Sequence, residues 1–396
     1  MTALMPTYAR SAIAFERGDG AYLTATDGRT YLDFAAGIAV DCLGHAHPHL
    51  VSALSQQAGK LWHVSNLYEI PEQARYAERL TDACFADAVF FCNSGAEAME
   101  GAIKAARRYH AHAGAPERYR AITISGAFHG RTLATLAAAA NPKHLEGYGP
   151  PVDGFDQVAF ANMNELRAAI GSETAAIIAE PVQGEGGIRV MDDDYLRGLR
   201  DTADEFGLLL IFDEVQSGFG RTGKLFAHEH SGISPDIVAA AKGIAGGFPC
   251  GAVLAVDKVA AAMTPGSHGS TFGGNPLAMA VANATLDVIL GQGFLSDVEK
   301  AGRDLRASLD ALAAKYPRIV TEIRGIGLMI GMHIDEAVTH TDFCADLMEN
   351  GLLTVPAAEN VVRLLPPLIV REKEIAEALT ILERTCDSII LPTTKM

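Results

Sequence analysis

Long apolar runs and clusters of basic residues are both missing from this chain of 396 residues. No apolar stretch approaches the roughly 18 consecutive residues that a membrane-spanning helix needs, and the N-terminus lacks the pattern of a secretory signal. Acidic residues outnumber basic ones by 48 to 32, giving a formal net charge of −16, and no group of Lys and Arg could follow a phosphate backbone. We therefore expect a cytoplasmic protein with no membrane or nucleic-acid partner.

Cysteine is also scarce. The six cysteines lie far apart without C-x-x-C spacing, which excludes a disulfide scaffold or a zinc ribbon. We interpret most of them as small buried apolar residues. The histidines of GHAHPHL, His45, His47 and His49, surround a proline, and no Cys or carboxylate spacing completes a metal site. A structural turn is the better interpretation there, and no metal is expected.

Hydrophobic residues make up 49% of the chain, enough for a sizeable core. Between about residues 75 and 255, short apolar runs alternate with amphipathic stretches, one of which predicts a helix between Asp192 and Gly207. This alternation predicts an α/β fold with a mostly parallel sheet covered by helices on both faces, and ligands at the carboxyl ends of its strands. The predicted strands are 121–125, 175–182, 208–215, 236–243 and 250–256.

The C-terminal third changes character after an apolar helix predicted over 275–293. Strand-like runs follow at 325–334 and 361–370, and then a helix from Glu372 to Ser388. We predict three parts: an N-terminal segment that packs with the small domain, a large domain that binds the cofactor, and a smaller α+β domain. Their ranges are 1–50, 51–280 and 281–396.

Lys242 stands alone in an apolar, glycine-rich stretch, DIVAAAKGIAGGFPCGAV (236–253). Taken alone, it is more simply a lysine whose ammonium group reaches water. The alternative is a desolvated amine whose pKa is low enough for Schiff-base chemistry. Asp213 and Glu214 end the strand in LLLIFDEVQSG and should point to opposite sides, so that one faces a ligand. Asp213 could pair with a protonated ring nitrogen, although strand-end capping explains it equally.

Two further motifs contain groups suited to an anion or a flat ring. In CNSGAEAMEGAIKAARRY (92–109), Asn93 or Ser94 can cap a helix whose free N–H groups suit a phosphate, although an ordinary capped helix fits too. In AFHGRT (127–132), Phe128 could stack on a ring and Arg131 could hold a carboxylate.

One motif favours a different function. GFGRTG (218–223) matches the dinucleotide fingerprint and would suggest a nicotinamide-dependent dehydrogenase. Five residues separate it from the apolar end of its strand, however, and the stretch after it is a poor helix with Gly and Pro. The dehydrogenase remains the alternative from another class.

Six motifs occur in the order found in the class III, fold type I, pyridoxal phosphate aminotransferases, which this chain resembles from 20–40 to 361–368. They are NSGAEAME, AFHGRT, AEPVQGEGG, LLIFDEVQSGFGRTGKLFA, DIVAAAKGIAGGFPCGAV and GSTFGGNPLAMA. The resemblance implies a seven-stranded sheet, pyridoxal 5'-phosphate and a homodimer with a shared active site. Within the class, the motifs are most similar to those of acetylornithine aminotransferases, which implies acetylornithine and 2-oxoglutarate as substrates. Succinyldiaminopimelate, succinylornithine and 4-aminobutyrate stay open as donors.

The resemblance also implies how the cofactor ring is held. Lys242 would carry the cofactor and act as general base and acid. Asp213 would pair with the pyridine nitrogen, and Gln216 would reach the ring hydroxyl. Val215 and Phe128 would pack on opposite faces of the ring.

The cofactor phosphate would lie at the start of the 95–109 helix. The resemblance implies that Ser94, Gly95 and Ala96 hold it, and that Thr271 reaches it from the neighbouring subunit. Many members carry Thr where this chain has Ala96, so a backbone contact survives but a hydroxyl bond does not.

Substrate contacts are implied in the same way. Arg131, with Ser270 nearby, resembles the anchor for the α-carboxylate of acetylornithine, and Arg363 resembles the clamp for glutamate. Glu185 resembles the glutamate that pairs with this clamp and swings off when glutamate arrives. Ile38 occupies the position of a substrate-contacting tyrosine in ornithine aminotransferases, which argues against free ornithine.

Overall fold

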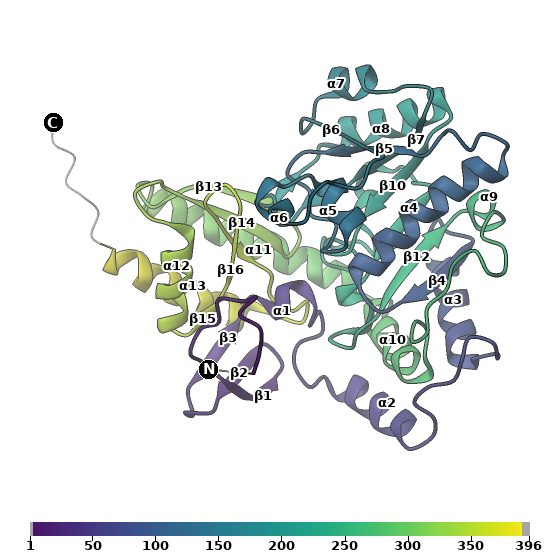
Figure 1. The fold of residues 1–396 in the computed structure, drawn as a ribbon. Coiled ribbons are helices and arrows are strands. Elements are labelled where there is room, and N and C mark those ends of the chain that lie inside the picture. Colours follow the sequence, from purple (N-terminus) through teal and green to yellow (C-terminus); the bar gives the residue numbers. More distant parts are fainter. Residues whose placement is uncertain (1–2, 390–396) are drawn as a thin grey trace.

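The computed structural model describes residues 3–389 and is built around a seven-stranded sheet in the order β4-β12-β11-β10-β7-β5-β6 (Figure 1). Strand β12 runs antiparallel to both its neighbours, and the other neighbouring pairs are parallel. The predicted mostly parallel, seven-stranded α/β sheet is confirmed. Its strands are β4 Ala88–Cys92, β5 Arg120–Ile124, β6 Phe155–Val158, β7 Thr174–Ala179, β10 Leu209–Asp213, β11 Ile237–Ala240 and β12 Gly251–Ala255.

Helices cover both faces of this sheet because side chains along each strand alternate between two cores. In β10, Leu209 and Ile211 belong to the core under helix α4, Gly95–His112. Leu210 and Phe212 face the larger core, which includes helices α8, Asp193–Phe206, and α10, Pro276–Ile289. The remaining helices of the large domain are α2 Pro48–Ala58, α3 Pro71–Ala83, α5 Leu133–Ala139, α6 Pro142–Leu145, α7 Met163–Ala168 and α9 Asp257–Ala260.

The helix predicted after Asp192 is confirmed together with both its ends. Asp192 caps α8 by accepting a hydrogen bond from the Tyr195 N–H at 2.7 Å. Gly207 ends the helix with a φ of 60°, a left-handed conformation that glycine adopts without a Cβ penalty. In residues 3–389 no single helix has the length and hydropathy to cross a bilayer, and the bent pair of α10 and the following helix meets that test only jointly.

A smaller antiparallel sheet, in the order β13-β14-β17-β16, forms the C-terminal part of the chain. The strand predicted over 325–334 is wrong in one respect, because the chain reverses at Gly327 and makes a hairpin. The run at 361–370 is a strand only to Leu364, since Pro366 and Pro367 lack the N–H that a ladder needs. The elements are α11 Phe294–Lys315, β13 Val320–Ile326, β14 Met329–Ile334, α12 His340–Glu349, β16 Val355–Ala357, β17 Val361–Leu364 and α13 Glu372–Ser388, the last as predicted.

The N-terminal strands lie beside this smaller part of the molecule (Figure 1). Strands β1, Phe15–Asp19, β2, Tyr22–Ala25, and β3, Thr30–Asp33, form one sheet with β15, Leu352–Leu353, which pairs with β3 in parallel. The short helix α1, Ala36–Ala39, follows. The domain boundaries at residues 50 and 280 stay predictions, and residue 280 itself lies inside α10.

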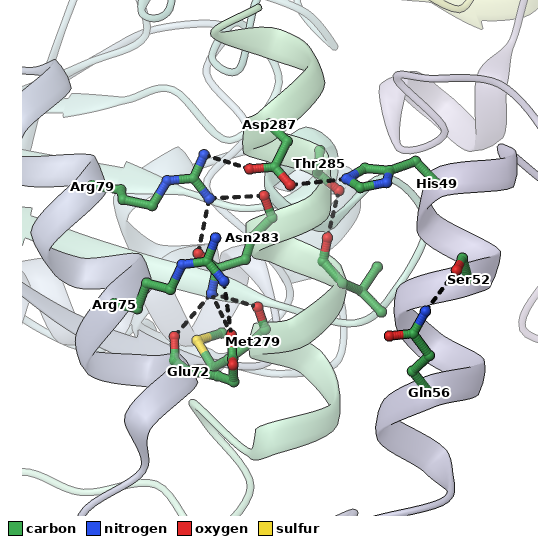
Figure 2. Close-up of polar contacts among 11 residues, drawn as sticks. His49, Ser52, Gln56, Glu72, Arg75, Arg79, Met279, Asn283, Thr285 and Asp287 are labelled. Atoms are coloured by element: carbon green, nitrogen blue, oxygen red, sulfur yellow. Dashed lines mark hydrogen bonds and ion pairs between the residues drawn. The ribbon is translucent and has the colours of Figure 1, made fainter.

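Helix α10 ties α2 and α3 to the large domain through charged and amide side chains (Figure 2). Asp287 on α10 bonds His49 of α2 at 2.8 Å and Arg79 of α3 at 2.8 Å. Arg79 also donates to the side-chain oxygen of buried Asn283 at 3.0 Å. Because α10 packs in addition against the turn η2, Lys242–Ala245, this network fixes the position from which Lys242 projects.

Candidate active site

A cavity of about 420 Å³ opens where the parallel strands of the large sheet end. It collects side chains at the ends of five strands, β4, β5, β7, β10 and β11, as the position of ligand sites in parallel sheets leads one to expect. The predicted residues that line it are Ser94, Gly95, Ala96, Phe128, Arg131, Glu185, Asp213, Val215, Gln216 and Lys242, and they are joined by His129 and Glu180.

Lys242 follows β11 and starts the turn η2 with a φ of 50°. This left-handed backbone is uncommon outside glycine. In this conformation the Lys242 side chain lines the cavity. Burial lowers the pKa of Lys242 to about 8; Glu185 acts against this shift, and Arg363 adds to it. The interpretation as a desolvated amine therefore fits the structure better than that of a lysine whose head reaches bulk water.

The pKa of Lys242 predicts how pH affects the ligand-free protein. In the unfolded chain the amine keeps its proton up to about 10.5, whereas in the folded protein it loses it near 8. Between these pH values the unfolded state binds more protons, so stability attributable to Lys242 rises with pH. The quantity to measure is the free energy of unfolding of wild type minus that of Lys242→Met, obtained by urea denaturation. We expect this difference to rise by about 3 kcal/mol between pH 8 and pH 10.5. A pH-independent difference would show that the amine stays hydrated.

Asp213 lies at the end of β10 and is held by two neighbours. One carboxylate oxygen contacts Nδ1 of His129 at 2.7 Å, and the other accepts the Val215 N–H at 3.1 Å. Burial alone would lower the pKa of His129, but the hydrogen bond and the charge of Asp213, together with Glu180, raise it. Within residues 3–389, Nε2 of His129 is buried without a partner. The pair presents an oriented carboxylate to the cavity.

Glu180, after β7, is a second buried carboxyl group beside this pair. Burial, together with the charge of Asp213, raises the pKa of Glu180 above the usual range of a glutamate, whereas His129 acts against this shift. Glu180 accepts the Phe128 N–H at 2.8 Å and thereby fixes the loop that carries Phe128 and His129. Sequence reasoning assigned no role to His129 or Glu180, although His129 lies inside AFHGRT and Glu180 lies inside the strand predicted over 175–182, which ends at Ala179 in the structure.

Glu214 points away from the cavity, as the alternation along β10 predicts. It contacts Nδ1 of His228 at 2.8 Å and accepts the His228 N–H at 3.0 Å. Ser217 donates to its other oxygen at 3.1 Å. Only one of the two adjacent carboxylates is therefore available to a ligand.

The start of α4 is both a capped helix and a wall of the cavity. Ser94 is the cap, and its hydroxyl accepts the Glu97 N–H at 3.3 Å. The N–H groups of Gly95 and Ala96 come before that bond, where a helix has no internal partner for them. A Cβ at Gly95 would lie 2.7 Å from Cγ1 of Val215, so only glycine brings the backbone this close. This arrangement suits an anion.

Two arginines differ in their relation to the cavity: Arg131 lines it, whereas Arg363 lies behind the lining residues Glu185 and Gln216. Arg363 is 1% exposed, and its two terminal nitrogens contact both oxygens of Glu185 at 2.6 and 3.0 Å. It also donates to the side-chain oxygen of Gln216 at 3.2 Å. Arg131 is exposed and contacts His144 and the ring of Phe128, neither of which is acidic. One arginine is therefore covered by a carboxylate, and the other is open to an anionic ligand.

Ser270 and Thr271 lie outside this cavity. They line a neighbouring depression of about 280 Å³ that also contains Phe272. The Ser270 hydroxyl lies 3.3 Å from Nδ2 of Asn93 and accepts the Gly273 N–H at 2.9 Å. Within one chain, Ser270 and Thr271 therefore do not line the cavity that contains the other predicted site residues.

The dehydrogenase alternative is wrong because GFGRTG lacks the strand, turn and helix that a dinucleotide site requires. Residues 218–223 form turns, and a short 3-10 helix, Ala227–Ser231, follows them. Arg221, in the middle of the motif, is buried and donates to the backbone oxygens of Leu328 and Pro366. The segment connects the two parts of the molecule instead of binding a nucleotide.

The comparisons agree on one family. The class-III aminotransferase family matches residues 5–386. The acetylornithine aminotransferase of Mesorhizobium japonicum is 60% identical over 378 residues, covering 96% of this chain and 94% of that protein. That of Agrobacterium fabrum is 56% identical, with 98% and 96% covered.

Solved structures extend the likeness to the fold. The ornithine aminotransferase of Toxoplasma gondii superimposes with a TM-score of 0.93 at 32% identity, covering 98% of this chain and 93% of that one. The N-acetylornithine aminotransferase of Stenotrophomonas maltophilia gives a TM-score of 0.84 at 37% identity, covering 96% and 97%. The chain belongs to the class-III aminotransferases.

Proposed function

We propose that this protein transfers the terminal amino group of N2-acetyl-L-ornithine to 2-oxoglutarate, giving N-acetyl-L-glutamate 5-semialdehyde and L-glutamate, with pyridoxal 5'-phosphate as cofactor. The observation that carries the proposal is a desolvated Lys242 and an oriented Asp213 in one cavity, with Arg363 covered by Glu185. Relatives that carry the name acetylornithine aminotransferase at 55–60% identity support it.

The cavity has a group suited to each part of the cofactor. The N–H groups of Gly95 and Ala96 suit the phosphate, and the apolar side chains of Phe128 and Val215 suit the faces of a flat ring. Asp213 suits a protonated ring nitrogen. When bound, pyridoxal phosphate supplies an electron sink for the carbon that bears the amine.

The protein's own groups supply proton transfer and orientation. Nζ of Lys242 has a pKa near 8 and exchanges a proton with the substrate carbon that carries the amine. His129 keeps the Asp213 carboxylate in place through the bond at 2.7 Å. Gln216 lies between the ring site and Arg363 and contacts the guanidinium at 3.2 Å.

Two substrates use the same cavity in turn. We propose that Arg131 binds the α-carboxylate of acetylornithine, which lies several bonds from the reacting amine. Glutamate reacts at its α-carbon and needs a carboxylate clamp close to the ring, for which buried Arg363 is suited. Glu185 neutralises Arg363 in the first half-reaction and must leave it in the second.

We further propose that the protein is a cytoplasmic homodimer. Large apolar side chains gather near Thr271, and patches of this kind mark interfaces. These side chains come from residues 62–68 and from the loop around Phe272. Asn66 connects the two segments, because it donates to the backbone oxygens of Ser270 and Gly273 at 3.0 Å each. In a dimer formed through this surface, Ser270 and Thr271 would approach the partner's cavity. The patch comprises Trp62, Leu67, Tyr68 and Phe272, which are 61–88% exposed.

The proposed substrate is tested by comparing donors at saturating 2-oxoglutarate. We expect kcat/KM for acetylornithine to exceed that for succinylornithine, succinyldiaminopimelate, ornithine and 4-aminobutyrate. A methylene or small acyl group changes binding by about 1–3 kcal/mol, so differences of about tenfold or more are expected. If 4-aminobutyrate reacted faster, Arg131 would not be the anchor described above.

A further inference from the structure

The Glu185 side chain is carried by a tight hairpin between the two parts of the molecule. Strands β8, Val182–Gln183, and β9, Arg189–Val190, pair in antiparallel fashion, and residues 184–188 connect them. The Gln183 amide donates to the Ser125 backbone oxygen of the large domain at 3.0 Å. The Glu185 backbone oxygen accepts the Ala358 N–H of the smaller part, also at 3.0 Å. The hairpin thus touches both parts.

A second contact joins the hairpin to the smaller part through one carboxylate. Glu359 lies 2.7 Å from Nη2 of Arg324 on β13 and 3.6 Å from Nη1 of Arg189 on β9. Arg189 also packs over the Phe160 ring of the large domain at 3.9 Å. The second carboxylate near Arg324 is Glu322, at 4.0 Å. Without Glu359, Arg189 and Arg324 would face each other with less negative charge between them.

The turn that presents Glu359 is held in an unfavourable conformation. Glu359 and Asn360 have φ values of 58° and 54°, which non-glycine residues adopt only where the surroundings enforce it. The Asn360 side chain does so: it donates to the backbone oxygens of Ile334 at 2.7 Å and Val338 at 2.9 Å and accepts the His340 N–H at 2.7 Å. Glu359 therefore projects from a fixed point.

The hairpin itself has little room to adjust. A Cβ at Gly187 would lie 2.8 Å from both the Ala358 oxygen and Nη2 of Arg324. Ile188 is fully buried with a φ of 54° and packs in a core with Met329. A shift of the hairpin backbone that carries Glu185 away from Arg363 must therefore strain or break contacts at this end of the hairpin.

We infer that Glu359 is a positioning residue that sets substrate preference: by pairing with Arg189 and Arg324 it holds the hairpin where Glu185 covers Arg363. Losing this carboxylate makes the uncovered state easier to reach. Glutamate, which needs Arg363 free, then reacts more readily, and acetylornithine less readily. This inference rests on the proposed roles of Glu185 and Arg363.

The test measures the two half-reactions separately in the holoenzyme and takes the ratio of kcat/KM for glutamate to that for acetylornithine. We expect Glu359→Gln to raise this ratio about fivefold, which corresponds to about 1 kcal/mol for a partly exposed ion pair. Glu359→Asp should restore part of the change. The control is Glu205→Gln on α8, which removes an exposed ion pair with Arg167 at 2.8 Å. It should leave the ratio unchanged.

A double variant separates this role from a merely structural one. If Glu359 acts through Glu185, then Glu359→Gln should add nothing to the ratio in a Glu185→Gln background. An equal loss in both half-reactions, an unchanged ratio, or an additive effect in the double variant would each overturn the inference. An unchanged ratio in Glu185→Gln alone would refute both the proposed covering of Arg363 by Glu185 and the inference about Glu359. Failure of the proposed function would appear differently, as absence of either half-reaction in wild type.

Discussion

Replacing Lys242 with alanine will lower turnover of acetylornithine with 2-oxoglutarate by a factor on the order of 10⁴. The side chain lines the cavity, and it is the amine there whose pKa is lowered to about 8. Alanine removes both the covalent attachment point and the group that moves the proton. Steady-state kinetics with added pyridoxal phosphate measure the loss.

The Lys242→Ala variant also allows a spectroscopic comparison. Wild type should absorb in the near-visible, and borohydride should fix the cofactor to the peptide that contains Lys242. The variant should show no such fixation, whereas Lys60→Ala, at an exposed position, should behave like wild type. Turnover by Lys242→Ala within tenfold of wild type would contradict the assignment.

Replacing Asp213 with asparagine should lower kcat/KM by a factor on the order of 10³, a size comparable to the loss of one preorganised electrostatic contact. The change keeps the shape of the side chain but removes the negative charge at the bottom of the cavity. An amide cannot stabilise a proton on the ring nitrogen, and it leaves His129 without the charged partner 2.7 Å away.

Kinetics with both substrates and titration of cofactor binding measure this effect. Both half-reactions should slow by similar factors because Asp213 contacts the cofactor site and not the carboxylate clamps. Asp310→Asn, at an exposed ion pair with Arg306, is the control and should retain full activity. A loss below tenfold would mean that Asp213 supports the fold more than the chemistry.

The sequence predicted the sheet and most of the cavity because both depend on local signals. Alternation of apolar strands and amphipathic helices predicts a parallel sheet, and polar residues at strand ends then meet at one edge. The confirmed cap of Asp192 and end at Gly207 are local signals of the same kind. The reversal at Gly327 was missed, because an unbroken apolar run does not reveal where the chain turns back.

The environment of Lys242 could not be predicted from its own stretch. Its pKa depends on burial and on Glu185 and Arg363, which are far away in the sequence and come together only in the folded chain. His129 and Glu180 were missed because a histidine or glutamate after a strand is usually structural. Their proximity to Asp213 is visible only in the folded chain. Ser270 and Thr271 line a separate depression of the single chain, and the proposed homodimer is what would bring them to a partner's cavity.

Isotope transfer tests the central claim most directly. Acetylornithine labelled with ¹⁵N at its terminal amine is incubated with the enzyme, pyridoxal phosphate and unlabelled 2-oxoglutarate, and the products are analysed by mass spectrometry. We predict that the label appears in the α-amino group of glutamate, and that N-acetylglutamate 5-semialdehyde forms in equal amount. Label that stays in acetylornithine, while 4-aminobutyrate or succinyldiaminopimelate passes its nitrogen to glutamate, would contradict the proposed function.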